Sequence, residues 1–350
     1  MAAYTSINKP TDNFRTKLYT GNGSARSITF DESTNMQPDL MWLKGRNTTA
    51  SWLCNDVLRG ATKRLKLDAN SAESTETGMI SSFDTNGFSL GTTSTSNNNG
   101  SNYVAYSWKA AGAGSSNGDG TTTSTVSVNT AAGCSLVQYA GASSAKTIGH
   151  GLGVTPDLMI VKTYSSGYEW AVYHKDLGAG KNLYLDSNGG ASNTTTFWNN
   201  TAPTNQVFSA GGQIIYTNYS GQNYIAYCFA SKRGYSRIGT YEGNGSSDGT
   251  FVYTGFKPAW VLIKQSSASG EEWQLLDNKR NTFNPTNTAI FPSDTAVENS
   301  GTDRSDFLSN GFKLRSNSAG VNASGATYVY AAFAEEPLVD STGKIPTTAR

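Results

Sequence analysis

Charged residues are scarce in this chain of 350 residues. Only 15% of the residues are charged, and the 27 lysines and arginines nearly balance the 26 aspartates and glutamates, which leaves a formal net charge of +1. Nucleic acids and anionic membranes attract proteins through clustered positive charge. The composition therefore argues against either of them as a partner.

Histidine and cysteine are rarer still. Metal-binding spacings such as Cys-x-x-Cys or His-Glu-x-x-His are absent, so the sequence predicts no metal site and no cofactor. Cys54, Cys134 and Cys228 occupy non-equivalent places in the repeated pattern of the chain, so no disulfide framework is repeated, and we expect free buried thiols. His150 and His174 have no repeated Ser or Cys beside them, so we predict no catalytic residue and no enzyme activity.

Long apolar runs are also missing. No run approaches the 18 residues of a membrane span, and the N-terminus has neither the basic nor the apolar region of a secretion signal. We therefore expect no membrane insertion and a chain made and kept in a reducing cytosol. Gly, Ser, Thr and Asn interrupt every helical period, whereas short β-branched and aromatic runs are frequent, which predicts an all-β protein.

One pattern recurs three times. An aromatic-Gly turn is followed by a Pro-led apolar strand, a Trp and Asp segment, and a Tyr-rich closing strand. The leading prolines, Pro38, Pro156 and Pro258, are 118 and 102 residues apart. This spacing is too long for a solenoid repeat and fits tandem domains. We predict three tandem homologous antiparallel β-sandwich domains of the jelly-roll type.

The predicted boundaries follow the three repeats. The Gly-, Ser- and Thr-rich stretch between the first and second repeats is predicted to be a flexible linker or an extended loop. Asn86-Gly87 and Asn310-Gly311 predict hairpins in the first and third repeats, and the second repeat has Gly211-Gly212 in the corresponding stretch. The segments are an N-terminal arm (1–17), repeat 1 (18–110), the linker (111–131), repeat 2 (132–231), repeat 3 (232–337) and a C-terminal tail (338–350).

The Pro-led strands are apolar at consecutive positions. This holds for residues 40–43, 158–161 and 260–263. A sandwich strand with one face in water would alternate between apolar and polar residues. Both faces should therefore be covered, either by a neighbouring repeat or by another chain, and we expect the three domains to pack closely.

The tryptophans divide into repeated and unrepeated ones. Trp52, Trp170 and Trp273 recur at matched places, which indicates core residues on a strand that leads into a turn. The aspartates assigned to the same pattern are Asp56, Asp176 and Asp277.

The second repeat contains the unrepeated aromatic residues. Trp198, Tyr216 and Tyr219 are the candidate binding patch, because exposed rings are what a sugar-binding surface would use. Asp119 and Asp248 lie in Asp-Gly turns that could bind calcium, although such turns need no ion.

Several motifs resemble a group of virion structural and tail-fibre-like proteins of tailed bacteriophages, common in marine phages. They are Tyr-Thr-Gly-Asn-Gly at 19–23, Val-Thr-Pro-Asp-Leu-Met-Ile-Val-Lys at 154–162, Tyr-Ile-Ala-Tyr-Cys-Phe-Ala at 224–230 and Phe-Leu-Ser-Asn-Gly-Phe-Lys-Leu-Arg-Ser at 307–316. The resemblance covers nearly the whole chain and brings no catalytic or binding residues with it. It implies a non-enzymatic component of the tail fibre or capsid surface, assembled in the host cytoplasm.

Three functions stay open at this point. A virion structural protein would bind other virion proteins, either as a homotrimeric fibre or as a capsid decoration whose three domains imitate threefold symmetry within one chain. A lectin-like module would bind a host-surface glycan through the aromatic patch. A polysaccharide depolymerase would need a pair of carboxylates across a groove.

Overall fold

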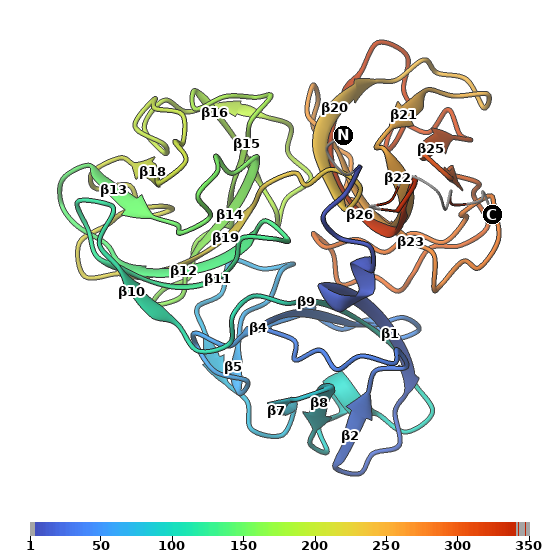
Figure 1. Cartoon of the computed structure of the whole chain (residues 1–350), viewed down its shortest axis with the longest axis horizontal. Helices are drawn as coiled ribbons and strands as arrows, with labels where there is room; N and C mark the ends of the chain where they lie inside the picture. The colour runs from blue at the N-terminus through green and yellow to red at the C-terminus, as the bar shows by residue number, and fades with distance from the viewer. Residues whose placement is uncertain (1–3, 341, 343–346, 348–350) are drawn as a thin grey trace.

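The computed structural model describes residues 4–340, 342 and 347 and confirms an all-β protein. Its helices within these residues are a 3-10 turn, η1 (Pro10–Asp12), and one short α-helix, α1 (Ser94–Asn97). No helix of the described part is long and apolar enough to cross a membrane. Figure 1 shows three lobes arranged around a common centre. We name them unit 1 (residues 14–108), unit 2 (115–229) and unit 3 (236–337).

Each unit contains an antiparallel sheet with the same order of four strands. The bounds are β1 Phe14–Thr20, β3 Leu40–Gly45, β4 Leu53–Asp56 and β9 Asn102–Trp108; β12 Cys134–Ala140, β14 Leu158–Thr163, β15 Ala171–His174 and β19 Asn223–Phe229; β20 Ser236–Glu242, β22 Phe256–Gln265, β23 Gln274–Asp277 and β26 Thr327–Pro337. The orders are β1-β9-β3-β4, β12-β19-β14-β15 and β20-β26-β22-β23. In all three, the Tyr-rich closing strand lies between the first strand and the Pro-led strand.

A smaller sheet covers the outer face of each main sheet. Its strands are β2 Arg26–Thr29, β7 Ile80–Asp84 and β8 Gly87–Leu90 in unit 1; β13 Lys146–Gly149 and β18 Val207–Ala210 in unit 2; β21 Phe251–Tyr253, β24 Ser305–Leu308 and β25 Gly311–Leu314 in unit 3. The Asn-Gly pairs join β7 to β8 and β24 to β25, which confirms the two predicted hairpins. The β-sandwich character is thus confirmed, and a jelly-roll topology stays a prediction.

The stretch between the first two repeats is not a simple linker. It contains β10 (Ser115–Asn117) and β11 (Ser124–Asn129), and β11 pairs with β12 along its whole length. Val126 and Val128 alternate with Ser and Thr in this segment, and Val126 is buried. Residues 115–129 therefore extend the sheet of unit 2. The remaining strands are β5 Lys63–Arg64, β6 Ser74–Thr75, β16 Lys181–Tyr184 and β17 Ser192–Asn193.

The Pro-led strands are buried on both faces, as predicted, and neighbouring units provide the cover. In β3, Leu40 and Trp42 face a core shared by all three units, whereas Met41 and Leu43 face the core under the small sheet of unit 1. Successive side chains of a strand point to opposite faces, so two apolar environments require an unbroken apolar run. The same division occurs in β14 and β22.

A triangle of aromatic rings lies in the shared core. Trp108, Phe229 and Phe333 occupy equivalent positions in the three closing strands. Their ring centroids are 6.1, 5.8 and 5.8 Å apart in the three pairings. Aromatic pairs at this separation are favourable beyond the area they bury. The triangle marks a pseudo-threefold axis within a single chain.

Repeated lysines connect the units around this axis. The lysine near the end of each Pro-led strand is buried, and burial lowers the pKa of all three to about 8. Each ammonium group donates to a backbone carbonyl of the next unit, so its charge is solvated by peptide dipoles. The contacts are Lys44 to Thr295 at 2.8 Å, Lys162 to Asn70 at 3.0 Å and Lys264 to Asn188 at 3.0 Å.

The repeated tryptophans cross the same junctions. They are buried, which confirms the core prediction, and each Nε1–H donates to a carbonyl of a neighbouring unit. In the lysine and the tryptophan contacts alike, unit 1 donates to unit 3, unit 3 donates to unit 2 and unit 2 donates to unit 1. The head-to-tail arrangement therefore closes into a ring. The contacts are Trp52 to Phe291 at 2.7 Å, Trp170 to Lys66 at 2.8 Å and Trp273 to Tyr184 at 2.9 Å.

Two of the three junctions also contain a buried ionic group. At the junction of units 1 and 2, Asp56 accepts from Arg59 at 2.6 Å and from the hydroxyl of Tyr227 at 2.8 Å. Asp277, Arg280 and Tyr106 repeat this arrangement between units 3 and 1. Burial acts to raise the pKa of Asp277, but the Arg280 guanidinium and the hydrogen-bond donors outweigh it and lower the pKa below its usual value.

The junction of units 2 and 3 departs from this pattern. Strand register aligns Asp56 and Asp277 with His174, because each of the three pairs with the second residue after the leading Pro. The assignment of Asp176 to the repeat is therefore wrong by two residues. The position of Arg59 is taken by Leu177, and the position of Tyr227 is taken by Ala331. This junction is less polar than the other two.

The predicted arm belongs partly to the fold. Strand β1 begins at Phe14, inside the predicted arm, and the Phe14 ring lies 5.3 Å from the ring of Phe333. Further upstream, the hydroxyl of Tyr4 donates to the carbonyl of Gly255 at 2.5 Å. The arm therefore docks on unit 3. Residues 1–3, and 341, 343–346 and 348–350 of the predicted tail, lie outside the described residues.

Removing the cation from a junction should weaken the whole fold. In Arg59→Met or Arg280→Met, a buried carboxylate loses its charged partner, and we expect the free energy of unfolding to fall by about 3–5 kcal/mol. Urea denaturation followed by tryptophan fluorescence measures this change. Lys17→Met is the control, because its partner Asp31 is 81% exposed and exposed pairs contribute about 1 kcal/mol or less. Equal effects in all three variants would contradict this role for the junctions.

Candidate functional site

Trp198 is not part of an exposed patch. Its side chain is fully buried in the outer core of unit 2, with its ring 5.6 Å from that of Tyr173. The segment before β18 is irregular where units 1 and 3 have β7 and β24, and it places Trp198 inside. Tyr219 is 40% exposed, and Tyr216 is partly buried against the core that contains Trp198. The structure does not bring the three predicted residues together as one surface.

Tyr216 instead belongs to a different aromatic group. Its ring stacks on Phe197 at 4.8 Å and lies 5.6 Å from Tyr184 and 6.0 Å from Tyr168. Phe197 is buried and anchors the group, whereas Tyr168 is 37% exposed. Burial, and secondarily the neighbouring Tyr216, raise the pKa of Tyr184 to about 12, so its hydroxyl stays protonated. We call Tyr168, Tyr184, Phe197 and Tyr216 the aromatic group.

An open hollow of about 520 Å³ lies beside the aromatic group, where units 1 and 2 meet. We call it the junction hollow. Unit 1 contributes residues of the segment after β5, and unit 2 contributes the residue before Trp170 together with the last residue of β16 and the segment that follows it. Its lining residues are Asp68, Ala69, Asn70, Glu169, Tyr184, Asp186 and Ser187.

The carboxylates of the junction hollow differ in their contacts. Asp186 accepts from the backbone N–H of Trp170 at 3.0 Å, and Asp68 accepts from that of Trp52 at 2.7 Å. Burial raises the pKa of Asp186 to about 6, although the Trp170 N–H and the Lys162 charge oppose the increase. Glu169 accepts no hydrogen bond from the described residues. One carboxylate of the hollow is thus left for solvent or a ligand.

Hydrogen bonds beneath the surface of the junction hollow hold its two walls together. Lys162 donates to the carbonyls of Asn70 in unit 1 and of Tyr168 in unit 2. The nearby backbone N–H of Glu73 also donates to the carbonyl of Tyr164 across the junction, at 3.0 Å. These contacts hold the backbone of both units together beside the hollow. The sequence did not predict Tyr168 and Glu169, which precede Trp170, as site residues. The only signal was that the equivalent residues in unit 1 are of other types, Ala50 and Ser51.

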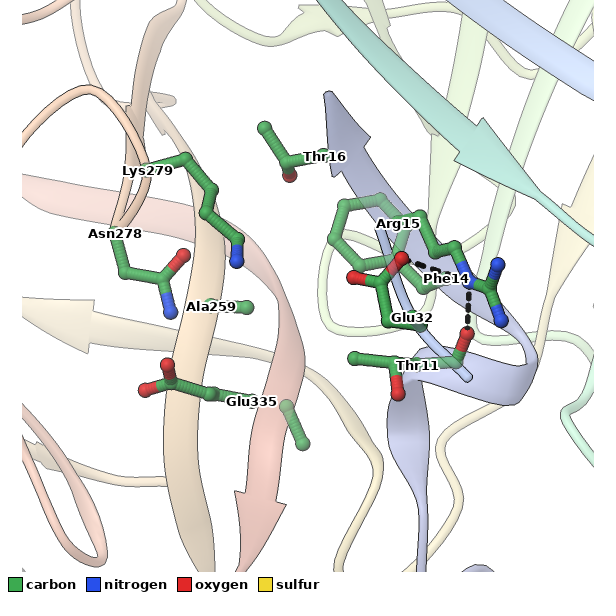
Figure 2. A pocket seen from close by; sticks show the side chains of 10 residues that line it. Thr11, Phe14, Arg15, Thr16, Glu32, Ala259, Asn278, Lys279 and Glu335 are labelled. Carbon is green, nitrogen blue, oxygen red and sulfur yellow. Dashed lines mark hydrogen bonds and ion pairs between the residues drawn. The ribbon is translucent and has the colours of Figure 1, made fainter. Parts of the chain in front are cut away.

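A second pocket, at the seam between units 1 and 3, is much smaller. Figure 2 shows Arg15 and Glu32 on one side and Asn278, Lys279 and Glu335 on the other. Its volume is about 70 Å³, close to the space of a few water molecules. The Arg15 guanidinium already donates to Thr11, Thr34 and Asn86 and pairs with Glu32 at 3.5 Å. The contacts of Arg15 make this pocket part of the packing between units 1 and 3.

The remaining candidates have structural contacts. His150 is buried, and the N–H of Leu152 donates to its ring. Asp248 pairs with Lys313 and Arg315, so its charge is already balanced. No group of three or more His, Cys, Asp or Glu residues in the described part could hold a metal ion.

The three cysteines are free and buried, as the sequence predicts. Burial raises the pKa of the Cys54 thiol to about 12, which makes it a poor nucleophile.

Comparison with known proteins identifies a family. A family model described as a domain of unknown function (DUF7483) matches residues 9–337. The chain belongs to the DUF7483 family. The match spans all three units, so the family corresponds to the complete ring and not to a single repeat. Comparisons with curated proteins and with solved structures found no match.

His174 should make the stability of this DUF7483 chain sensitive to acid. Burial lowers its pKa to about 4, against opposing effects of Asp176 and the Tyr330 backbone. Between pH 6.5 and 4 the unfolded chain binds a proton that the folded chain does not, so the free energy of unfolding falls as pH falls, by about 2–3 kcal/mol from this group.

The variant His174→Gln isolates this contribution. Asp186 acts in the opposite direction, because its raised pKa favours proton uptake by the folded chain. The measurement is therefore the difference between variant and wild type in urea denaturation at pH 7, 5.5 and 4. The variant should gain stability relative to the wild type as pH falls, and a difference that does not change with pH would contradict the prediction.

Proposed function

We propose that this chain is a non-enzymatic structural protein of a tailed-phage particle, on the capsid surface or the tail. The observation that carries the proposal is the closed pseudo-threefold ring around Trp108, Phe229 and Phe333. Virion positions with threefold or quasi-threefold symmetry present three equivalent surfaces, and a ring of three similar units can contact all of them at once. The resemblance of the sequence motifs to phage virion proteins is consistent with this proposal.

We further infer that the three units are tandem copies of one ancestral β-sandwich, with the jelly-roll topology as the expected form. The shared strand order supports this inference, as do the matched donors Lys44, Lys162 and Lys264. Each of these donors has its acceptor in the next unit. The junction surfaces are therefore used within the chain, and they leave no equivalent contact for forming a homotrimer.

The purified chain should consequently be a monomer. We expect light scattering coupled to size-exclusion chromatography to give a mass near 37.2 kDa. Concentrations from about 1 to 100 µM cover the range in which weak self-association would appear. A stable species of three times this mass would favour the homotrimeric fibre instead.

Incorporation into particles tests the function itself. In cells infected with a phage that carries the gene for this chain, we expect the protein to co-sediment with intact particles through a density gradient and to be identified there by mass spectrometry. A cryo-EM map of the same particles should place the ring against other virion proteins. Synthesis of the chain during infection without its recovery in particles would refute the proposal.

A further inference from the structure

The junction hollow combines aromatic rings with hydrogen-bonding groups. Tyr184 lines it, and Tyr168 and Tyr216 continue the aromatic surface beside it. Tyrosine offers an apolar ring face and a polar hydroxyl at its edge. The C–H face of a pyranose has the complementary shape and chemistry. The hollow is also large enough for a ligand of the size of one or two sugar residues.

The polar groups indicate an uncharged ligand. Asp68, Glu169 and Asp186 are acceptors when ionised, and the Asn70 amide and the Ser187 hydroxyl complete the lining. Vicinal sugar hydroxyls are donors that suit such acceptors. The ammonium group of Lys162 is already used by two backbone carbonyls. A carboxylate or phosphate ligand would therefore meet like charge without a free cation in the lining.

The equivalent position in unit 3 shows how a glutamate before the repeated tryptophan is used when it has a structural contact. Glu272 precedes Trp273 as Glu169 precedes Trp170. In unit 3, Ser293 caps the backbone of Trp273 and also donates to Glu272 at 2.5 Å. In unit 2 the cap is Asp186, which has no proton to donate when ionised, so Glu169 keeps its acceptor capacity. The free carboxylate occurs where the aromatic group is present.

We propose that the junction hollow binds an uncharged hexose oligosaccharide, with Tyr168 and Tyr184 against the sugar ring and Glu169 accepting hydrogen bonds from its hydroxyls. The site is held by the junction contacts of Lys162 and Trp170, so binding orders few groups. This activity is independent of where the chain lies on a particle. The Asp186 carboxylate acts as a positioning group, because it caps Trp170 and sets the adjacent backbone.

Calorimetric titration of the full chain tests the proposal. The probes are linear oligomers of glucose, galactose and mannose. Uronic-acid oligomers are titrated alongside them to test whether an anionic sugar binds. We expect at least one neutral oligomer to bind with a Kd of about 1 mM or tighter, and Tyr168→Ala and Glu169→Gln each to weaken it by about tenfold or more. Tyr219→Ala and Glu272→Gln are the matched controls, with changes below about twofold expected.

Three outcomes would overturn the proposal. They are no binding of any neutral oligomer, unchanged affinity in both Tyr168→Ala and Glu169→Gln, and stronger binding of the uronic-acid oligomers. Thermal unfolding of each variant confirms that the fold is retained, and the near-isosteric Glu169→Gln change keeps the test valid if Tyr168→Ala is unstable. Incorporation into particles is measured in a separate experiment. A failure to bind oligosaccharides would therefore not contradict the proposed structural role.

Discussion

The fold depends on one shared apolar core in which every unit buries the inner face of its main sheet. The aromatic triangle of Trp108, Phe229 and Phe333 lies within it, where the three closing strands converge. Aromatic side chains of this size remove about 150–250 Å² each from water. A unit on its own would expose that face, including Trp42 or its equivalent. The three units are therefore parts of one cooperative structure, and their association is a condition of folding.

The junction contacts turn this apolar association into a defined ring. Hydrophobic burial is non-directional and would tolerate several relative orientations of the units. Buried donors such as Lys162 and Trp170 are satisfied only when the matching carbonyls of the next unit are in place, because an unpaired buried donor is costly. The junction of units 2 and 3, with His174 and Ala331, keeps the equivalent donors Lys264 and Trp273 and lacks the ionic group. Orientation thus depends on the repeated lysines and tryptophans more than on the salt bridges.

Much of the frame could be predicted from the sequence because it is periodic and repeated. The apolar runs implied covered faces, and the matched tryptophans implied a core. Residues 115–129 were missed as strands because Val126 and Val128 are hidden in a Ser- and Thr-rich composition. Trp198 was misplaced because an unrepeated residue carries no information on burial, and only the three-dimensional packing of the segment before β18 places it inside. The junction hollow could not be predicted, since its walls are distant in sequence.

The same reasoning explains why the candidate site lies at a junction. Symmetric positions maintain the ring, so a change there alters contacts between units, whereas residues whose identity or contacts differ between copies are free to acquire another role. Tyr168 and Glu169 immediately precede the repeated Trp170, and the ring contacts of that tryptophan and of Lys162 fix their surroundings. A site in this place inherits the rigidity of the junction without disturbing it. The structural ring and the hollow are therefore compatible features of one chain, with the ring as the scaffold on which the asymmetric residues are displayed.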